Sequence, residues 1–135
     1  MIADASVLVA AADPRAPAHA AARELLVQPG EKIVTDAILS EAHHLIAKRA
    51  GWGIAAAFLE SVDTDLVVEV STPLDRARAR DLCRRYLDAR LDYTDALTVA
   101  VAERVGERVI ATLDERHFRM LRPSHVASFE IVPSG

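Results

Sequence analysis

The chain has 135 residues, a length that suits one domain, 1–135, built around a single hydrophobic core. Apolar residues make up 51% of it and charged residues 27%, which excludes an intrinsically disordered protein. The net charge of −4 argues against a general nucleic-acid coat protein, which would be basic. It is compatible with a nuclease, because bound divalent cations can offset clustered carboxylates.

The N-terminal apolar run, residues 2–12, is too short to cross a bilayer, which needs roughly 20 apolar residues. No basic region precedes it, and it contains Asp4. We therefore expect no signal peptide, no membrane contact and a cytoplasmic location. Cys83 is the only cysteine, which excludes an internal disulfide and a cysteine-based zinc site.

Hydrophobic periodicity and the positions of proline and glycine predict strands that alternate with helices. The expected strands are residues 1–5, 32–35, 66–70, 109–111 and 129–132. The first expected helix is short and ends near residue 12. The later helices are expected at 16–27, at 36–50, from the glycines at 51 and 53 to about 62, and at 73–90, 92–106 and 115–121. Asp36 and Asp92 are predicted to cap their helices, and Gly106 to end one. This alternation indicates βαβ units, and hence an α/β fold with a mainly parallel sheet.

Four acids fall where a parallel sheet binds ligands, outside the carboxyl ends of its strands. Asp4 ends the first strand, where burying a lone carboxylate would be costly, and Asp114 follows the strand at 109–111. Glu41 lies on the edge of the apolar face of the helix at 36–50, and Asp95 is near the start of a later helix. Each acid also has a purely structural alternative. Asp4 and Asp114 could cap helices, Glu41 could lie at the boundary of the apolar face, and Asp95 could interact with the helix dipole.

Together, the four acids predict a metal site. Carboxylates that converge repel one another, and their pKa values rise unless a cation pairs with them. Oxygen ligands without histidine or cysteine favour Mg²⁺ or Mn²⁺. This is the chemistry of two-metal phosphodiester hydrolysis, in which the ions lie roughly 3.5–4 Å apart.

Three further polar residues flank these acids. The hydroxyls of Ser6 and Thr112, each two residues from Asp4 or Asp114, are predicted to orient a carboxylate or a water, although a simple turn role is the alternative. Asp92 is expected to be a cap that can also reach the metal site.

Substrate phosphates need a positive rim. Arg116, Arg119 and Arg122 follow Asp114 and are candidates, and a second arginine cluster lies between residues 76 and 85. The alternative for both clusters is a solvated helix face. The five histidines show no metal-ligand spacing; they are His19, His43, His44, His117 and His125.

Four short motifs, in order along the chain, resemble those of PIN-domain ribonucleases. They are Asp4-Ala5-Ser6, Leu39-Ser40-Glu41, Asp95-Ala96-Leu97 running on to Gly106, and Thr112-Leu113-Asp114 followed by Phe118. The length and the ending at 129–133 resemble the VapC toxins within that family. Response-regulator receivers and haloacid-type phosphatases fit poorly: no lysine follows Lys48, and Asp4-Ala5-Ser6 lacks a second Asp.

The resemblance implies a three-layer α/β/α domain and a Mg²⁺- or Mn²⁺-dependent endoribonuclease, the toxin of a type II toxin–antitoxin system. It also implies homodimers and a cognate VapB-like antitoxin whose tail blocks the acidic site. The four acids would hold one or two ions, and a water of lowered pKa would attack the scissile phosphorus, oriented or deprotonated by Glu41 or Asp114. The alternative is a PIN-like regulatory module that binds RNA or protein without cleaving, against which the intact set of acids argues.

Overall fold

The sheet at the centre of the molecule is parallel throughout the described part of the chain. The computed structural model describes residues 1–134. The strands are β1 (Ile2–Ala3), β2 (Ile33–Thr35), β3 (Val67–Glu69), β4 (Val109–Ala111) and β5 (Glu130–Val132). They lie in the order β3-β2-β1-β4-β5, and every neighbouring pair is parallel. The predicted α/β fold with a mainly parallel sheet is confirmed.

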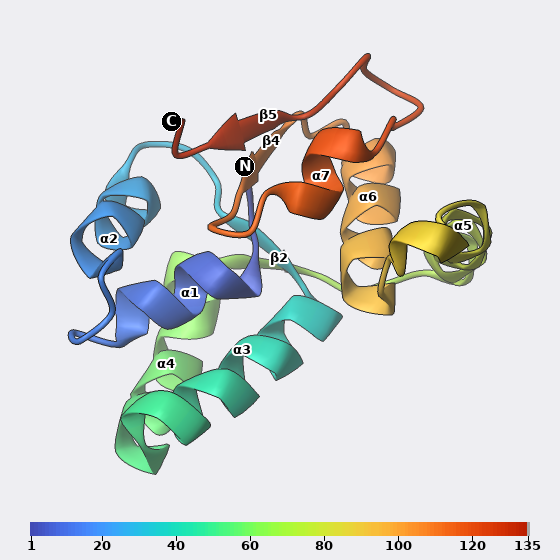
Figure 1. Cartoon of the computed structure of the whole chain (residues 1–135). Coiled ribbons are helices and arrows are strands. Elements are labelled where there is room, and N and C mark those ends of the chain that lie inside the picture. Colours follow the sequence, from blue (N-terminus) through green and yellow to red (C-terminus); the bar gives the residue numbers. More distant parts are fainter. Residues whose placement is uncertain (135) are drawn as a thin grey trace.

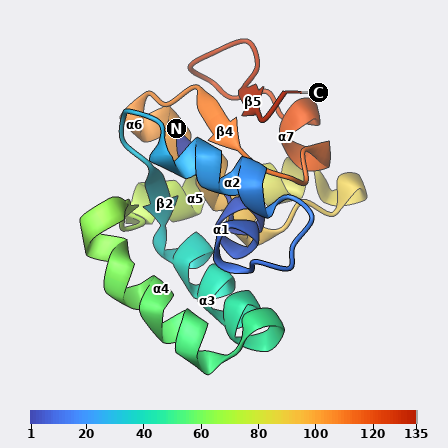
Figure 2. The ribbon, with the colours of Figure 1, turned by 90° about the vertical axis from the view of Figure 1, so that its left-hand side faces the viewer.

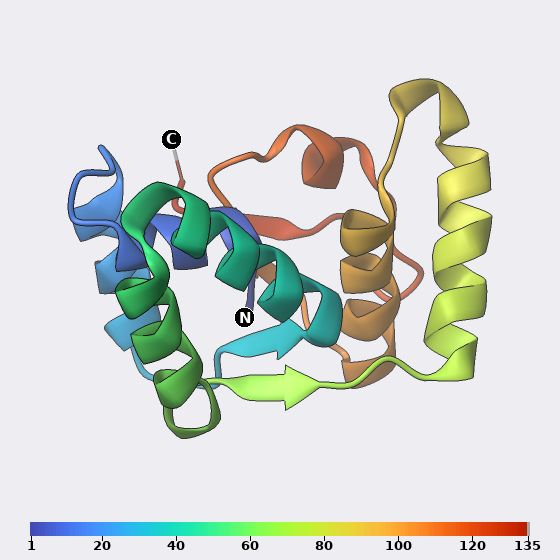
Figure 3. The same ribbon diagram turned by 90° about the horizontal axis from the view of Figure 1, so that it is seen from below.

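Helices cover both faces of this sheet. They are α1 (Ala5–Ala12), α2 (His19–Val27), α3 (Asp36–Ala50), α4 (Trp52–Asp65), α5 (Pro73–Arg85), α6 (Tyr93–Val105) and α7 (Arg116–Met120), with a 3₁₀ turn, η1 (Leu87–Ala89), after α5. Right-handed crossovers put α1 to α4 on one face and α5 to α7 on the other. Figures 1 and 3 show α5 and α6 on the opposite side of the strands from α1 and α2, and Figure 2 views the molecule from the α1–α4 side. The expected three-layer architecture is therefore present.

The core is aliphatic, and the three inner strands, β1, β2 and β4, lie at its centre. Ile2, Val34 and Ile110, on adjacent strands, have no exposed surface. Helix α6 packs its buried face, which includes Ala96 and Val99, into the same cluster. Because these strands are only two or three residues long, their carboxyl ends emerge directly from the buried sheet. The backbone of a residue that directly follows one of these strands is therefore fixed in position by the hydrophobic core.

Several helix termini differ from the sequence prediction: α2 begins at His19 instead of residue 16, α4 continues to Asp65 instead of about 62, and the start of α3 and the end of α5 also differ. Thr35, rather than Asp36, caps α3, because its Oγ1 accepts the Ile38 N–H at 3.0 Å while Asp36 is the first helical residue. Helix α5 ends at Arg85 instead of reaching residue 90. There the chain turns back towards α6 through η1 and Arg90, which has a left-handed backbone conformation (φ 56°). Arginine rarely adopts this conformation, so the sequence does not predict the turn.

The strand order reverses direction between β1 and β4, and this places the candidate site. The crossovers from β1 lead towards β2 and β3, whereas the chain returns from β3 to β4 on the other side of β1. In open parallel sheets, ligands bind at the carboxyl ends of the two strands that flank such a switch point. Asp4 directly follows β1, and Thr112 directly follows β4. Among residues 1–134, no helix is long and apolar enough to cross a membrane.

Candidate active site

Asp4 is a buried carboxylate held by hydroxyl groups from two segments. It occupies the N-cap position of α1, yet its side chain makes no capping hydrogen bond. Instead, its Oδ2 accepts hydrogen bonds from Thr112 Oγ1 at 2.8 Å and Ser6 Oγ at 3.1 Å. The Asp4 backbone N–H also donates to the Ala111 carbonyl at 2.8 Å, which continues the β1–β4 pairing by one residue. Asp4 is thus fixed by strand register rather than by a helix cap.

Ser6 and Thr112 form a network around this carboxylate. Their hydroxyl oxygens lie 3.3 Å apart. Ser6 Oγ accepts the N–H of Leu113 at 2.9 Å, and Thr112 Oγ1 accepts the N–H of Asp114 at 3.0 Å. The start of α1 and the loop after β4 are therefore tied together directly over the sheet edge. Ser6 contacts Asp4, the acid that it flanks in sequence, whereas Thr112, which flanks Asp114, contacts the Asp4 carboxylate.

Asp92 and Asp95 bring two more carboxylates to this edge from the start of α6. Asp92 is the N-cap, as predicted, and its Oδ1 accepts the Asp95 N–H at 2.9 Å. The side chain of Asp95 is 17% exposed, and its Oδ2 lies 2.9 Å from Nδ1 of His117 on α7. Asp95 therefore occupies the predicted dipole-favoured position and also points its carboxylate into the site region.

Electrostatic repulsion links four carboxylates here. Burial raises the pKa of Asp95 to about 7. The hydrogen bond with His117 is the main opposing effect, while repulsion from Asp92 and then Asp4 adds to the rise. Burial raises the pKa of Asp4, although the Thr112 and Ser6 hydrogen bonds oppose it. Desolvation, then repulsion from Asp4 and Asp92, raises the pKa of Glu41 on α3. The charged forms of Asp4, Glu41 and Asp95 are disfavoured together, so a cation between them would be stabilising.

Asp114 stands at the margin of this group. Its side chain is exposed, and it lines a shallow hollow of about 430 Å³ together with Ser6, Asp13 and Arg49. Its link to the other acids runs through its backbone N–H and Thr112. It does not cap α7, since Glu115 occupies that position. The structure thus gathers Asp4, Glu41 and Asp95 with Asp92, and leaves Asp114 beside them.

The arginines of the two clusters differ in their surroundings. Arg116 and Arg119 are exposed on α7, and Arg119 pairs with Glu115 at 2.7 Å. Arg78 of the other cluster makes a two-point contact with Glu103 at 2.8 and 3.0 Å, which joins α5 to α6. Arg78 therefore has a structural role. Arg116, by contrast, makes no side-chain hydrogen bond or ion pair with residues 1–134.

The donor set fits a hard divalent cation in an open site. Within the described residues, no three carboxylates, histidines or cysteines lie close enough to enclose an ion as they stand. Mg²⁺ retains several waters and is bound by one or two carboxylates together with substrate phosphates. Oxygen donors that repel one another at a sheet edge suit such an ion, with Asp4 and Asp95 as the most buried donors.

His117 is the residue that sequence reasoning missed. A search for metal-ligand spacing examines neighbours in sequence, whereas this contact joins residues 22 positions apart on different helices. The one signal in the sequence is that His117 directly precedes Phe118 of the fourth motif, because a buried aromatic residue fixes the position of the residue next to it.

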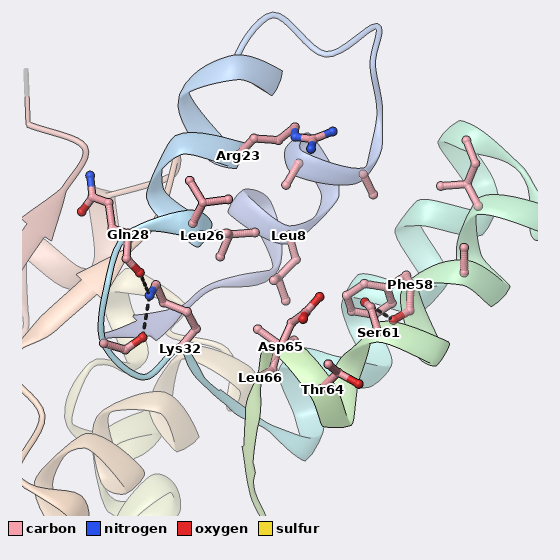
Figure 4. Close-up of a pocket in the computed structure, with 16 residues that line it drawn as sticks. Leu8, Arg23, Leu26, Gln28, Lys32, Phe58, Ser61, Thr64, Asp65 and Leu66 are labelled. Carbon is pink, nitrogen blue, oxygen red and sulfur yellow. Dashed lines mark hydrogen bonds between the residues drawn. The ribbon is translucent and has the colours of Figure 1, made fainter.

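A separate pocket lies away from these acids. It has a volume of about 780 Å³ and is lined mainly by α1, α2 and α4 with the segments that follow α2 and α4. Figure 4 shows Leu8, Leu26, Phe58 and Leu66 along its apolar wall. At one end, Lys32 Nζ donates to the carbonyl groups of Gln28 and Gly30. None of the predicted site residues lines this pocket.

Comparisons with known proteins identify the family. The PIN domain family matches residues 1–122. The chain is 32% identical over 135 residues to "Ribonuclease VapC26" of Mycobacterium tuberculosis, an alignment that covers 98% of this chain and all of that protein. Its fold matches the crystal structure of Mycobacterium tuberculosis VapC20, described as a Sarcin-Ricin loop cleaving toxin, with a TM-score of 0.78, 22% identity, and coverage of 84% and 89% of the two chains. The chain therefore belongs to the PIN-domain family and is a homologue of the VapC ribonuclease toxins.

Proposed function

We propose that this protein is a metal-dependent endoribonuclease, the toxin of a type II toxin–antitoxin pair, which hydrolyses RNA phosphodiester bonds with Mg²⁺ or Mn²⁺. The observation that carries this proposal is the coupled set of Asp4, Glu41, Asp92 and Asp95, whose repulsion is focused at the switch point of the sheet. The homology to the VapC ribonucleases supports RNA as the substrate.

Asp4, Glu41, Asp95 and Asp114 would hold one or two ions, with Asp4 and Asp95 as the tightest ligands because they are the most shielded from water. When bound, the cation polarises the scissile phosphate and lowers the pKa of an attacking water. Ser6 and Thr112 keep Asp4 in place through its Oδ2. Asp92 holds the first turn of α6, and with it the backbone of Asp95.

Of the four proposed ligands, Glu41 and Asp114 are exposed, whereas Asp4 is buried and Asp95 is half-buried. Glu41 and Asp114 are therefore the ligands placed to orient or deprotonate the attacking water. For the substrate, Arg116 is the stronger candidate for a phosphate contact, because Arg119 is partly neutralised by Glu115. Both arginines lie on α7, the helix whose His117 contacts Asp95.

The proposed partner is a VapB-like antitoxin encoded for this toxin, together with a second copy of the chain as a homodimer. The tail of this antitoxin would block the acidic site. A different segment of it would pack on the apolar wall of the pocket in Figure 4, which has Arg23 and Asp65 among its polar lining residues. Apolar side chains at Val70, Leu74 and Leu87 are exposed by 67% to 82% and offer surface for a partner near α5.

The experiment is an RNA cleavage assay on purified, antitoxin-free protein with Mg²⁺ or Mn²⁺ against EDTA. Asp95→Asn should abolish metal-dependent cleavage. Asp81→Asn, an equivalent change at an exposed aspartate on α5, should leave it intact. A protein that binds RNA and Mn²⁺ but cleaves no RNA in a broad panel would instead be a non-cleaving module. Absence of Mn²⁺ binding would rule out the acid site itself.

A further inference from the structure

The contact between Asp95 and His117 joins two helices across the candidate site. Nδ1 of His117 lies 2.9 Å from Oδ2 of Asp95, and the two side chains are only 15% and 17% exposed. His117 belongs to α7 and Asp95 to the first turn of α6. The contact is therefore largely shielded from water, and a hydrogen bond to a carboxylate is stronger there than on an open surface.

The position of His117 is fixed by its neighbours on both sides. The next residue, Phe118, is 1% exposed and packs edge-on against Phe129 with ring centroids 6.4 Å apart. The loop before α7 is anchored where Leu113 donates its N–H to Ser6 Oγ. A short helix held in this way presents His117 in one place, so the ring can set the orientation of the group it contacts.

The two oxygens of Asp95 have different surroundings. Oδ2 faces His117, whereas Oδ1 accepts no hydrogen bond from residues 1–134. A carboxylate with one oxygen held by a donor cannot rotate freely, and its second oxygen stays available for another partner. Hydrogen bonds of this kind orient the carboxylates that bind metals in proteins.

We propose that His117 is a positioning residue, whose Nδ1–H donates to Oδ2 of Asp95 and keeps Oδ1 available for the divalent cation. This inference rests on the proposed function of the acids. It assigns α7 two tasks, because the helix that carries Arg116 also orients the carboxylate beside it.

The test compares His117→Leu with His117→Asn, which retains an N–H donor near the place of Nδ1. We expect Leu to weaken Mn²⁺ binding, measured by calorimetry, by about 10-fold or more, and Asn to recover most of the loss. At saturating Mn²⁺, Leu should lower kcat while KM for RNA stays nearly unchanged. His19→Gln is the matched control, because His19 makes a 2.9 Å contact through the same ring nitrogen, but to the Ala10 carbonyl.

A second readout needs no metal. In metal-free protein above neutral pH, NMR of the imidazole nitrogens should find the proton of His117 on Nδ1, and Asp95→Ala should move it towards Nε2, as in exposed histidines. If the unaltered protein binds Mn²⁺ and folded His117→Leu binds it equally well, the inference is overturned while the proposed function stands. If the unaltered protein binds no Mn²⁺, the proposed function fails and this inference fails with it.

Discussion

Thr112 Oγ1 donates a 2.8 Å hydrogen bond to Oδ2 of Asp4, across 108 positions of the chain. The preceding residues, Ala3 and Ala111, are register partners on β1 and β4. The position of the hydroxyl relative to the carboxylate is therefore set by the pairing of two buried strands. A shift of that pairing by one residue would turn the side chains of β4 to the other face and remove the contact.

Thr112→Val should separate this hydrogen bond from the packing around it, because the side chains have nearly the same shape. Loss of the donor leaves Asp4 with Ser6 at 3.1 Å. We expect the free energy of unfolding to fall by about 1–2 kcal/mol in urea titrations, together with weaker Mn²⁺ binding. Thr112→Ser keeps the hydroxyl and should retain both properties. Cleavage and Mn²⁺ affinity equal to those of the unaltered protein would contradict a role for Thr112 in holding Asp4.

The stability of the metal-free protein should fall as the pH rises from 5 to about 7. The pKa of Asp95 is raised from 3.8 to about 7, so the folded state binds a proton that the unfolded state releases at lower pH. The stabilisation from that proton is complete below about pH 4 and is lost as the pH passes 7, with a slope of about 1 kcal/mol per pH unit. The pKa values of Asp4 and Glu41 are also raised, so these two carboxyl groups contribute to the slope with the same sign.

Urea titrations between pH 5 and 7.5 measure this slope. Asp95→Asn should flatten it, and Asp81→Asn should not. Saturating Mn²⁺ should also flatten the slope, because the cation stabilises the ionised carboxylates. A slope that is unchanged in Asp95→Asn would show that this carboxyl is not the group responsible.

Asp75→Ala should destabilise the fold without affecting the chemistry. Asp75 is 3% exposed, caps α5 through the Thr72 N–H at 2.9 Å, and pairs with Arg104 at 3.0 Å. Removing the cap and the ion pair should lower the free energy of unfolding by about 2 kcal/mol. Asp81→Ala on the same helix should cost less than about 0.5 kcal/mol. Mn²⁺ affinity should be unchanged in both, and a large loss in Asp75→Ala would mean that α5 contributes to the site.

Arg116→Ala should raise KM for RNA more than it lowers kcat. A phosphate contact contributes to binding of the whole strand, and its loss also reduces the salt dependence of binding by about one charge. Arg119→Ala should have a smaller effect because Glu115 already pairs with Arg119. The control is Arg80→Ala, an exposed arginine on α5. Equal salt slopes for Arg116→Ala and the unaltered protein would exclude Arg116 from the RNA surface.

Much of the fold could be predicted because its signals are local. Asp92 and Gly106 mark the ends of α6 through a side-chain cap and a left-handed glycine, and both were identified from sequence. The end of α5 was not, because it depends on Arg90 adopting a left-handed conformation to meet α6. The cap of α3 was displaced by one residue, since Thr35 and Asp36 are both good caps and strand pairing decides between them.

The site could be predicted in part for the same reason. The positions of Asp4 and Asp95 follow from strand and helix ends that the sequence reveals. The contact of His117 with Asp95 depends on how α7 packs on α6, which local patterns do not contain. The exposure of Asp114 likewise depends on the path of the loop between β4 and α7.

The strand order also determines when the site can form during synthesis. Asp4, Glu41 and Asp95 are synthesised before the segment at 112–117, which contains the donor for Asp4 and the histidine beside Asp95. Until β4 pairs with β1, the central strand has an unpaired edge on that side, and the acids are not held in fixed positions relative to one another. A nascent chain that stops before residue 109 would therefore carry most of the acids in no working arrangement. For a nuclease acting on RNA, this would delay activity until the segment at 109–117 has been synthesised and has folded against the earlier strands.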